Sequence, residues 1–211
     1  MNKYAVLAVA SLAMPAVAAQ AAPDVNTNPA AVPSGHYTSV PGHTEVTFGI
    51  IHMGMSPFYG MLGNGIGTLD FSSKDPAKST VSVKFEMNGI YTPSERLNGM
   101  LRDADVFDVA QFPEATFTST SIRKTARNKG DITGNLTLHG VTKPVTLHAT
   151  FYGSRQMMGE RMGFGATARI KRSDFGLTEM KWDKLVADGV DLMIEAEFVQ
   201  DNGQQPSQDA K

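Results

Sequence analysis

The sequence contains no cysteine among its 211 residues. This absence excludes disulfide-stabilised folds, a cysteine nucleophile and a lipid-modified N-terminal cysteine. An excess of positive charge is lacking too, since 19 Lys and Arg stand against 21 Asp and Glu and the formal net charge is -2. Proteins that bind nucleic acid present a clustered basic face. No basic stripe occurs here, so we expect no nucleic-acid partner.

Catalytic signatures are also missing from the sequence. There is no nucleophile elbow, no phosphate-binding glycine loop that opens a helix, and no pair of histidines at metal-ligand spacing. The spaced glycines Gly63, Gly65 and Gly67 lack the strand-to-helix setting of a dinucleotide site and are better explained as bends of a barrel. We therefore expect no enzymatic activity.

The N-terminus has the features of a secretory signal. Lys3 supplies the positive charge, residues 4–14 form a short apolar run, and residues 16–21 offer small-residue cleavage sites. The apolar run is shorter than the roughly 20 residues that a transmembrane helix needs. Export combined with the absence of cysteine predicts a periplasmic protein whose signal, residues 1–22, is removed.

Composition divides the remaining chain into three parts. Residues 23–34 are rich in Pro, Asn and Ala and predict a flexible lead-in, whereas residues 201–211 are polar and predict a disordered tail. Residues 35–200 are long enough for one domain with a sizeable core. We expect a single domain between two flexible ends.

Alternation of apolar and polar residues dominates this domain. It is clearest over residues 131–139 and 143–152, which predict two antiparallel strands joined by a tight turn at His139 and Gly140. The other predicted strands cover residues 43–53, 60–71, 80–91, 115–122, 163–171 and 189–200. About eight strands suffice to close an antiparallel barrel around one ligand. The predicted fold class is therefore all-β, an eight-stranded lipocalin-like barrel.

One short helical segment interrupts the strands. Residues 92–95, TPSE, form a capping box, which predicts Thr92 as the N-cap and Pro93 as the first helical residue. Leu97, Met100 and Leu101 follow at helical spacing and predict an apolar face against the barrel. Residues 105–110 predict one or two further turns. This helix fits a lid equally well as a plug at one barrel end.

The inward faces of the strands define the candidate binding site. They combine long apolar side chains with small ones, and small residues leave volume that either neighbouring side chains or a ligand can fill. The residues predicted to line the interior are Phe48, Ile50, His52, Phe85, Met87, Phe117, Leu136, Leu138, Leu147, Phe151, Phe164, Ala166, Ala168, Ile170, Leu192 and Ile194. The pattern alone does not decide between a packed interior and a cavity.

Two arginines are candidates for the mouth of such a cavity. Arg102 and Arg172 could hold a phosphate or quinone oxygen of a ligand's polar head. The alternative for Arg172 is an ion pair with Asp174 that stabilises a turn. The inward His52 is predicted to be a hydrogen-bonded core or mouth residue rather than a metal ligand or a base.

Methionine is grouped at two places in the sequence. His52, Met53, Met55 and Met61 form one group, and residues 157–162 hold Met157, Met158 and Met162. Thioether groups can bind copper(I), but they also fill gaps in cores and line adaptable lipid-binding surfaces. We expect no metal and no tightly bound cofactor.

Several ordered motifs together point to a known family. They are His43, Val46, Phe48 and His52; residues 101–102, 107–109 and 112–113; residues 116–117 and 119–120; GNLTLHGVTKPV at residues 134–145; and RSDFG at residues 172–176, after Gly163 and Phe164. In this order the sequence, from about residue 37 to 199, resembles the YceI-like family of periplasmic lipid-binding proteins. One stretch departs from the family, because residues 97–102 read LNGMLR where an Arg-Asp-x-His-Leu-Arg pattern is common.

The resemblance implies a lipocalin-like barrel with an elongated apolar pocket for polyisoprenoid chains, isoprenoid quinones or other long amphiphiles. It also implies a membrane cytochrome b of the b561 type as a partner. We therefore expect the protein to bind, carry or sequester such an amphiphile in the periplasm.

Two alternatives remain open at this stage. One is a redox accessory whose bound quinone reacts beside His52. The other is a ligand-free structural or stress-protection module, with or without copper, whose interior would be packed. The sequence leaves open whether the protein transports or stores its ligand and whether it is a monomer or a homodimer.

Overall fold

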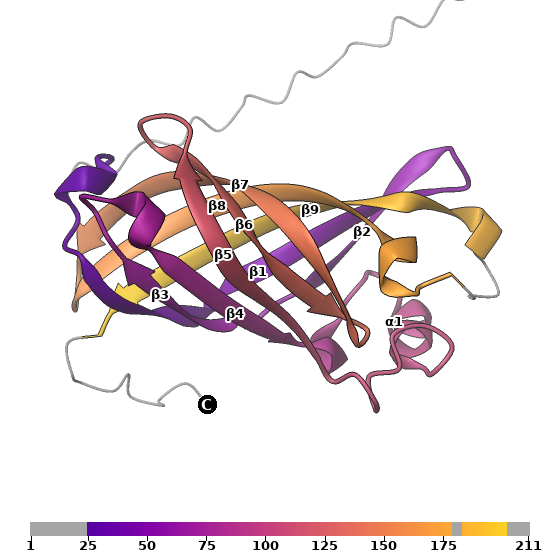
Figure 1. The fold of residues 1–211 in the computed structure, drawn as a ribbon. Coiled ribbons are helices and arrows are strands. Elements are labelled where there is room, and N and C mark those ends of the chain that lie inside the picture. Colours follow the sequence, from indigo (N-terminus) through magenta and orange to yellow (C-terminus); the bar gives the residue numbers. More distant parts are fainter. Residues whose placement is uncertain (1–24, 179–182, 202–211) are drawn as a thin grey trace, which may run out of the picture.

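The computed structural model describes residues 25–178 and 183–201, which form an elongated barrel of antiparallel strands (Figure 1). The predicted signal, residues 1–22, and residues 202–211 of the predicted tail lie outside this range. The strands are β1 (Gly35–His52), β2 (Ser56–Leu62), β3 (Ile66–Phe71), β4 (Thr80–Glu86), β5 (Glu114–Lys124), β6 (Lys129–Leu138), β7 (Val141–Gln156), β8 (Glu160–Lys171) and β9 (Val186–Gln200). The helices are α1 (Glu95–Arg102) and the 3-10 turns η1 (Pro29–Ala31), η2 (Pro76–Lys78), η3 (Met87–Gly89), η4 (Arg172–Phe175) and η5 (Asp183–Leu185).

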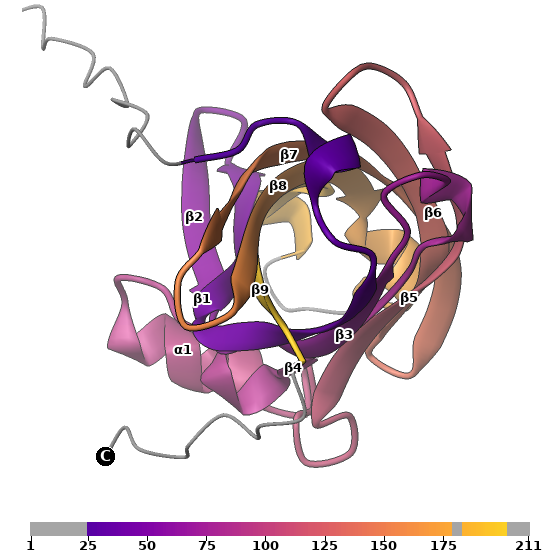
Figure 2. The ribbon, with the colours of Figure 1, turned by 90° about the vertical axis from the view of Figure 1, so that its left-hand side faces the viewer.

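The barrel closes through pairing of β1 with β9. Strands β3 to β9 pair in sequence order, β3 pairs with β1, and β9 completes the ring against the other edge of β1 (Figure 2). The predicted fold, a closed eight-stranded antiparallel barrel with one short helix, is confirmed. No helix in the described part of the chain is long and apolar enough to cross a bilayer.

Strand β2 is additional to this ring. The predicted single strand over residues 60–71 is wrong, because the chain turns at residues 63–65 and divides it into β2 and β3. Asn64 has a φ of 59°, and a Cβ at Gly65 would lie 2.6 Å from the ring of Phe85. β1 also begins at Gly35, earlier than predicted, and its two halves pair with β3 and β2 along one edge.

A hydrophobic cluster packs the end of the barrel where β1 begins. Its buried members are Val32, Tyr37, Leu69, Phe151, Met162 and Phe198. Val32 precedes the first strand and is only 2% exposed, and Asn26 exchanges two backbone hydrogen bonds with Ser154 at 2.9 and 2.8 Å. Asn26 and Val32 of the predicted lead-in thus contact the barrel end, and the flexibility expected for residues 23–34 stays a prediction.

A second cluster packs the opposite end, where α1 lies to one side of the barrel axis (Figure 2). Its buried members are Leu62, Phe85, Met87, Ile90, Leu101, Val106 and Ala115. Leu101 of α1 belongs to this cluster, so the helix is part of a packed end, as a plug would be. The one or two further helical turns predicted over residues 105–110 do not form a helix.

The helix begins two residues later than the capping box predicts. Ser94 is the N-cap, and its side chain accepts a hydrogen bond from the N–H of Leu97 at 3.3 Å. Thr92 has another role, because its backbone N–H and hydroxyl donate to Oδ1 of Asn98 at 2.6 and 2.8 Å. Asn98 is 1% exposed and returns a bond from Nδ2 to the Thr92 carbonyl. This paired contact fastens the helix to the chain before it.

Removing the Asn98 amide should destabilise the protein more than removing the cap. In Asn98→Ala, the buried Thr92 N–H loses its acceptor, and we expect the free energy of unfolding to fall by about 2–3 kcal/mol. Ser94→Ala removes one exposed cap bond and should cost about 1 kcal/mol. Urea denaturation of both variants measures the difference, and equal losses would contradict the assigned role of Asn98.

Tyr37 should titrate later than an ordinary tyrosine. It is 0% exposed, its hydroxyl donates to the Pro33 carbonyl at 2.7 Å, and burial, with a smaller effect of the Glu160 charge, raises the pKa of Tyr37 to about 12. Because this pKa lies above that of the unfolded chain, the associated stability is complete below about pH 10 and is lost towards pH 12. An absorbance titration should show a late phenolate step that Tyr37→Phe removes; an unchanged curve would argue against it.

Candidate functional site

The middle of the barrel interior lies between the two packed ends. Along β8, Ala166, Ala168 and Ile170 share the inward face, whereas Thr167 and Arg169 are exposed on the outside. The inward side chains in the middle of the barrel are half-buried and belong to neither end cluster: Ile50, Phe117, Leu136, Leu147, Ala166, Leu192 and Ile194. A filled core would bury such residues fully. The interior between the clusters is therefore accessible.

The other predicted lining residues have different places. Phe85 and Met87 are buried in the helix-end cluster, where Phe48 and Leu138 pack against them. At the other end Phe151 is buried, with Phe164 beside it. Ala168 and Ile170 are buried on the inward face of β8. Several residues that were expected to form one continuous lining thus belong to the two packed ends.

His52 is not an interior residue. It is exposed, at the last position of β1, where the register between β1 and β9 shifts after Ile50. The buried inward position predicted for it is wrong, because His52 is exposed at the last position of β1, at the barrel end. The extra residues of the irregularity lie on β9, between Val186 and Val190, and the pairing of β1 with β2 continues without a shift. It therefore does not line the accessible interior.

Small side chains widen the interior at one level. Ala149 of β7 pairs with Ala166 of β8, which pairs with Ile194 of β9. On β6, the residue that pairs with Ala149 is Gly130, whereas Gly134 pairs with Val145 and lies under the ring of Phe117. Two alanines and a glycine at this level leave more room than larger residues would, so this level is the centre of the candidate ligand site.

The wall of the barrel opens between β7 and β8. Their pairing runs from Gln156 and Glu160 to His148 and Thr167 and ends there, although β7 extends to Val141 and β8 to Lys171. In Figure 1 the β6–β7 hairpin bends away from β8 and β9. A cavity of about 640 Å³ lies at this gap, lined by Lys143, Pro144, Val145, Thr146, His148, Arg169, Ile170, Lys171, Asp174, Phe175, Asp188 and Gly189.

Charged groups surround this opening. Arg169 pairs with Asp191 at 2.9 Å, and His148 lies 2.9 Å from Asp131. Lys143 and Lys171 are exposed at the rim. Lys143 was missed as a candidate, although it pairs with Leu136 and so shares the inward face of β7. Apolar walls with lysines at the rim can bind a molecule that has a long apolar chain and a polar head.

η4 fills the space beneath the opening. Phe175 is 1% exposed, and its carbonyl oxygen lies 3.2 Å from Nδ1 of His139 in the β6–β7 turn. The N–H and hydroxyl of Ser173 both donate to Asp188 at 2.9 Å, and these bonds, the backbone one first, lower the pKa of the Asp188 carboxyl. The RSDFG motif is thus an anchor that fastens the end of β8 to β9 and to the β6–β7 turn.

Arg172 belongs to this anchor. Its guanidinium, in a residue 8% exposed, donates to the carbonyls of Leu177, Ala187 and Val186 at 2.5, 3.1 and 3.4 Å. The head-group role predicted for Arg172 does not fit this arrangement, because its donors already hold the backbone. Arg172 therefore stabilises this turn through backbone carbonyls. The ion pair with Asp174, which was the alternative, stays a prediction.

Arg102 lies at the C-terminal end of α1. Its Nη2 donates to the Ile90 carbonyl at 3.1 Å, and its Nε is buried without a hydrogen-bond partner among the described residues. The guanidinium therefore helps to hold the helix end to the chain around η3. A head-group role for Arg102 stays a prediction.

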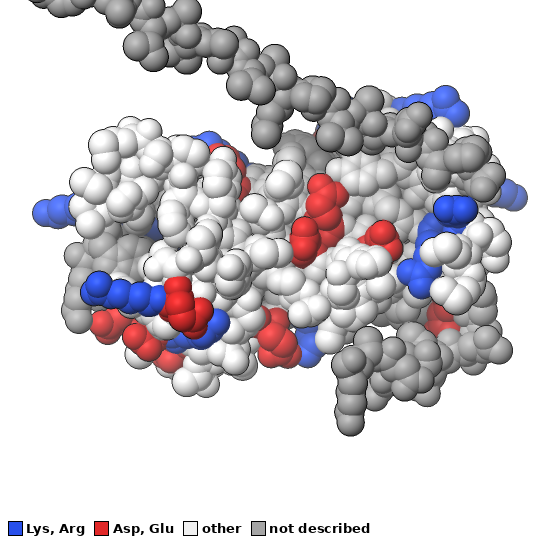
Figure 3. Space-filling view, turned by 180° about the vertical axis from the view of Figure 1, so that it is seen from behind, with Lys and Arg blue, Asp and Glu red and all other residues white. Residues whose placement is uncertain are grey.

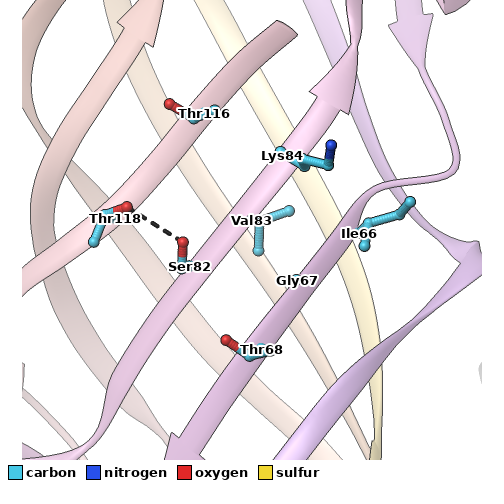
Figure 4. A pocket seen from close by; sticks show the side chains of 8 residues that line it. All are labelled: Ile66, Gly67, Thr68, Ser82, Val83, Lys84, Thr116 and Thr118. Carbon is cyan, nitrogen blue, oxygen red and sulfur yellow. Dashed lines mark hydrogen bonds between the residues drawn. The ribbon is translucent and has the colours of Figure 1, made fainter.

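A second depression lies outside the barrel. Figure 4 shows its lining on β3, β4 and β5, where Ser82 and Thr118 are hydrogen-bonded at 3.3 Å. Its volume is about 370 Å³, and its one cation, Lys84, is paired with Glu114 at 2.5 Å. This groove lies on the outer face of the sheet and is open to solvent, so it does not enclose an apolar chain, and we place the candidate site in the interior.

The two methionine groups do not converge. Met53 and Met55 lie in the β1–β2 turn, whereas Met157 and Met158 lie in the β7–β8 turn at the other end of the barrel, and Met162 is buried in the cluster there. Within residues 25–178 and 183–201, no group of three or more His, Cys, Asp or Glu side chains could hold a metal ion.

Loss of the Arg172 guanidinium should destabilise the fold. In Arg172→Met the buried carbonyls lose their donor, and we expect the free energy of unfolding to fall by about 2–4 kcal/mol. Arg169→Met, on the same chain segment, removes an ion pair whose partners are each 66% exposed and should cost less than about 1 kcal/mol. Urea denaturation compares the two; a smaller loss in Arg172→Met would show that the carbonyls are satisfied without it.

Comparisons with known proteins agree with this architecture. The model of the YceI-like domain matches residues 37–198. Protein YceI of Salmonella arizonae is 42% identical over 160 residues, covering 75% of this chain and 82% of that protein. The crystal structure of the YCEI protein of Campylobacter jejuni is 29% identical, with a TM-score of 0.62, and the match covers 70% of this chain and 87% of that one.

Two more distant structures share the fold. BcnA of Burkholderia cenocepacia has a TM-score of 0.66 at 24% identity, over 73% of this chain and 95% of that one. A polyisoprenoid binding domain from Saccharophagus degradans has a TM-score of 0.61 at 16% identity, over 78% of this chain and 98% of that one. The match to the domain model and the identity to the Salmonella protein confirm the resemblance seen in the sequence motifs: this chain belongs to the YceI-like domain family.

Proposed function

We propose that this protein binds a long apolar amphiphile, a polyisoprenoid or an isoprenoid quinone, in the interior of its barrel. The observation that carries the proposal is the set of half-buried apolar residues between two packed ends, among them Phe117, Leu136, Ala166 and Ile194. The family membership and the polyisoprenoid binding domain from Saccharophagus degradans, which shares the fold, support this class of ligand.

The driving force for binding would be burial of the apolar chain. Each methylene removed from water contributes about 0.8 kcal/mol. A chain of several isoprene units offers enough buried surface to offset the cost of association and leave an affinity of about micromolar or better. Selectivity would come from the length of the interior and from the few polar groups at its opening, so a mixture of related chains should bind.

The β7–β8 opening is the best place for the polar head. An isoprenoid chain in contact with Ala149 and Ala166 would leave through the gap beside Val145 and Ile170, with its head between Lys143 and Lys171. Ammonium groups can bind a phosphate or a quinone oxygen there. This arrangement needs no group that performs catalysis, and the proposal is binding, for carriage or sequestration.

We place this function in the bacterial periplasm. The signal features of residues 1–22 and the absence of cysteine support this location. With a quinone as cargo, a membrane cytochrome b of the b561 type is a candidate partner, as the family resemblance implies. The redox alternative receives less support, because His52, expected beside the quinone ring, is exposed at the end of β1.

Native mass spectrometry of the protein purified from its own periplasm is the direct test. We expect one polyprenyl or quinone molecule per chain, identified after extraction with organic solvent. A protein that carries no such molecule and takes up neither polyprenols nor quinones when they are supplied would sink the proposal and favour the ligand-free structural role.

A single substitution should block the interior. Ala166→Phe places a large ring at the widest level and should weaken ligand binding at least about tenfold, because the ring occupies volume that the chain needs. Thr167→Phe is the matched control, since the neighbouring side chain on β8 is exposed on the outer face. Ligand binding by titration and unfolding by urea are compared for both. A folded Ala166→Phe protein that binds as tightly as the unmodified chain would contradict the site.

A further inference from the structure

The β1–β2 hairpin projects from the barrel at the helix end (Figure 1). β1 and β2 pair from Val46 and Leu62 to His52 and Ser56, and residues 53–55 form the turn. β9 covers one edge of β1 as far as His52. The outer edge of β2 has one bridge among the described residues, between Met61 and Tyr91, so the tip is a two-stranded ribbon open to solvent.

The tip exposes large apolar side chains. Met55 is 74% exposed, Tyr59 57%, Met53 53% and Ile51 39%. Ile51 pairs with Pro57, and Tyr59 lies over Gly49, so these side chains form one face that points away from the barrel interior. Folding leaves this small apolar face uncovered, with its large side chains grouped at one projecting tip.

The hairpin is also free of charge. No Asp, Glu, Lys or Arg occurs from Val46 to Leu69. Figure 3 shows the result as an uncharged surface at the upper left, where the hairpin of Figure 1 lies when seen from behind. By contrast, the other exposed methionine turn, Met157 and Met158, is flanked by Arg155, Glu160 and Arg161.

We propose that this hairpin tip docks the protein onto the surface of a phospholipid bilayer. Methionine and isoleucine at the turn would enter the acyl boundary, and Tyr59 would lie at the level of the head groups, where aromatic rings with a polar end are favoured. Because the tip carries no charged side chain, the attraction is apolar and needs no anionic lipid.

Two observations favour a bilayer over a protein partner. The tip is a two-stranded ribbon about five residues long, so its face measures roughly 17 by 10 Å. This area is far below the roughly 800 Å² that each partner buries in a stable protein interface. Pro57 lies on the open edge of β2 and has no N–H, which blunts that edge against an added strand of a second copy. A bilayer needs only a few inserted side chains.

Two N–H groups of the turn already have acceptors within the protein. The N–H of Met53 donates to the Leu185 carbonyl at 2.6 Å, and the N–H of Met55 donates to the His52 carbonyl at 3.0 Å. An unsatisfied N–H would oppose insertion, because hydrocarbon provides no acceptor. Leu185, itself 43% exposed, adds a further apolar side chain beside the tip, next to the exposed Lys184 of η5.

The docked end is also the end with the β7–β8 opening. Lys171 pairs with Gly189 on β9, and the adjacent Val190 pairs with Ile50 near the tip of β1. Docking would thus bring the opening close to the membrane, where an isoprenoid enters or leaves. This last step depends on the proposed function, whereas the docking itself does not.

Vesicle flotation with the full mature chain tests the proposal. The double variant Met53→Asn with Met55→Asn should lower the partition coefficient at least about tenfold, since burial of each methionine is lost. The matched control is Met157→Asn with Met158→Asn at the other end of the barrel. Met53 and Met158 have φ values of 52° and 49°, which asparagine adopts readily, so both variants should fold.

The lipid composition separates the possible causes. Binding to phosphatidylcholine vesicles should equal binding to vesicles that contain phosphatidylglycerol, and added salt should not weaken it. Absence of binding, equal loss in both double variants, or binding that requires phosphatidylglycerol and low salt would overturn the proposal. So would a dimer in light scattering that the Met53 and Met55 changes dissociate, because a second copy would then cover the tip.

Uptake of the cargo keeps this test independent of the proposed function. When polyprenol is supplied from dilute ethanol, the Met53 and Met55 variant should load as well as the unmodified protein, whereas loading from vesicles should be slower by about the same factor as its binding. Failure to load by any route would count against the lipid-binding function while the flotation result still decides the docking.

Discussion

The structure depends on the pairing of β1 with β9, which joins the two ends of the chain's sheet into a ring. β1 is long enough to pair with β9 from Tyr37 to His52 while its other edge is shared by β3 and β2. Closure removes the exposed edges of the eight ring strands and forces every inward side chain towards a common axis. The accessible interior and the projecting hairpin depend on where this pairing starts and stops, whereas the opening in the wall depends on where β7 and β8 stop pairing.

The packed ends explain why a hollow middle is stable. Val32 and Tyr37 close one end, and the other is filled by residues of the α1 segment around Leu101. Each cluster buries apolar surface that a lone sheet would leave in water, and burial of this kind supplies most of the favourable free energy of folding. The barrel can therefore leave the alanine level between β7, β8 and β9 unfilled, where a ligand can replace the missing packing.

The buried polar side chains stabilise the structure around the interior and do not line the interior itself. Arg172 holds three backbone carbonyls, Asn98 holds Thr92, and Ser173 is bonded to Asp188. Buried polar groups of this kind must be satisfied, and their bonds fix where η4 and α1 lie. A ligand in the interior would therefore meet apolar side chains along the walls and lysines at the opening. This arrangement suits the binding of an amphiphile.

The sequence by itself determined most of the strands, their inward and outward faces and the closed all-β fold, because alternation with a period of two is a local property of each strand. It also carried the family motifs. Only the tertiary structure decided which inward residues are packed and which are accessible, since Phe85 and Phe117 follow the same alternation but only Phe85 meets an end cluster. The partners of Arg172, the exposure of His52 and the gap beside Lys143 depend on how far separate strands stay paired. That distance is set by contacts between residues remote in sequence, which no local pattern records.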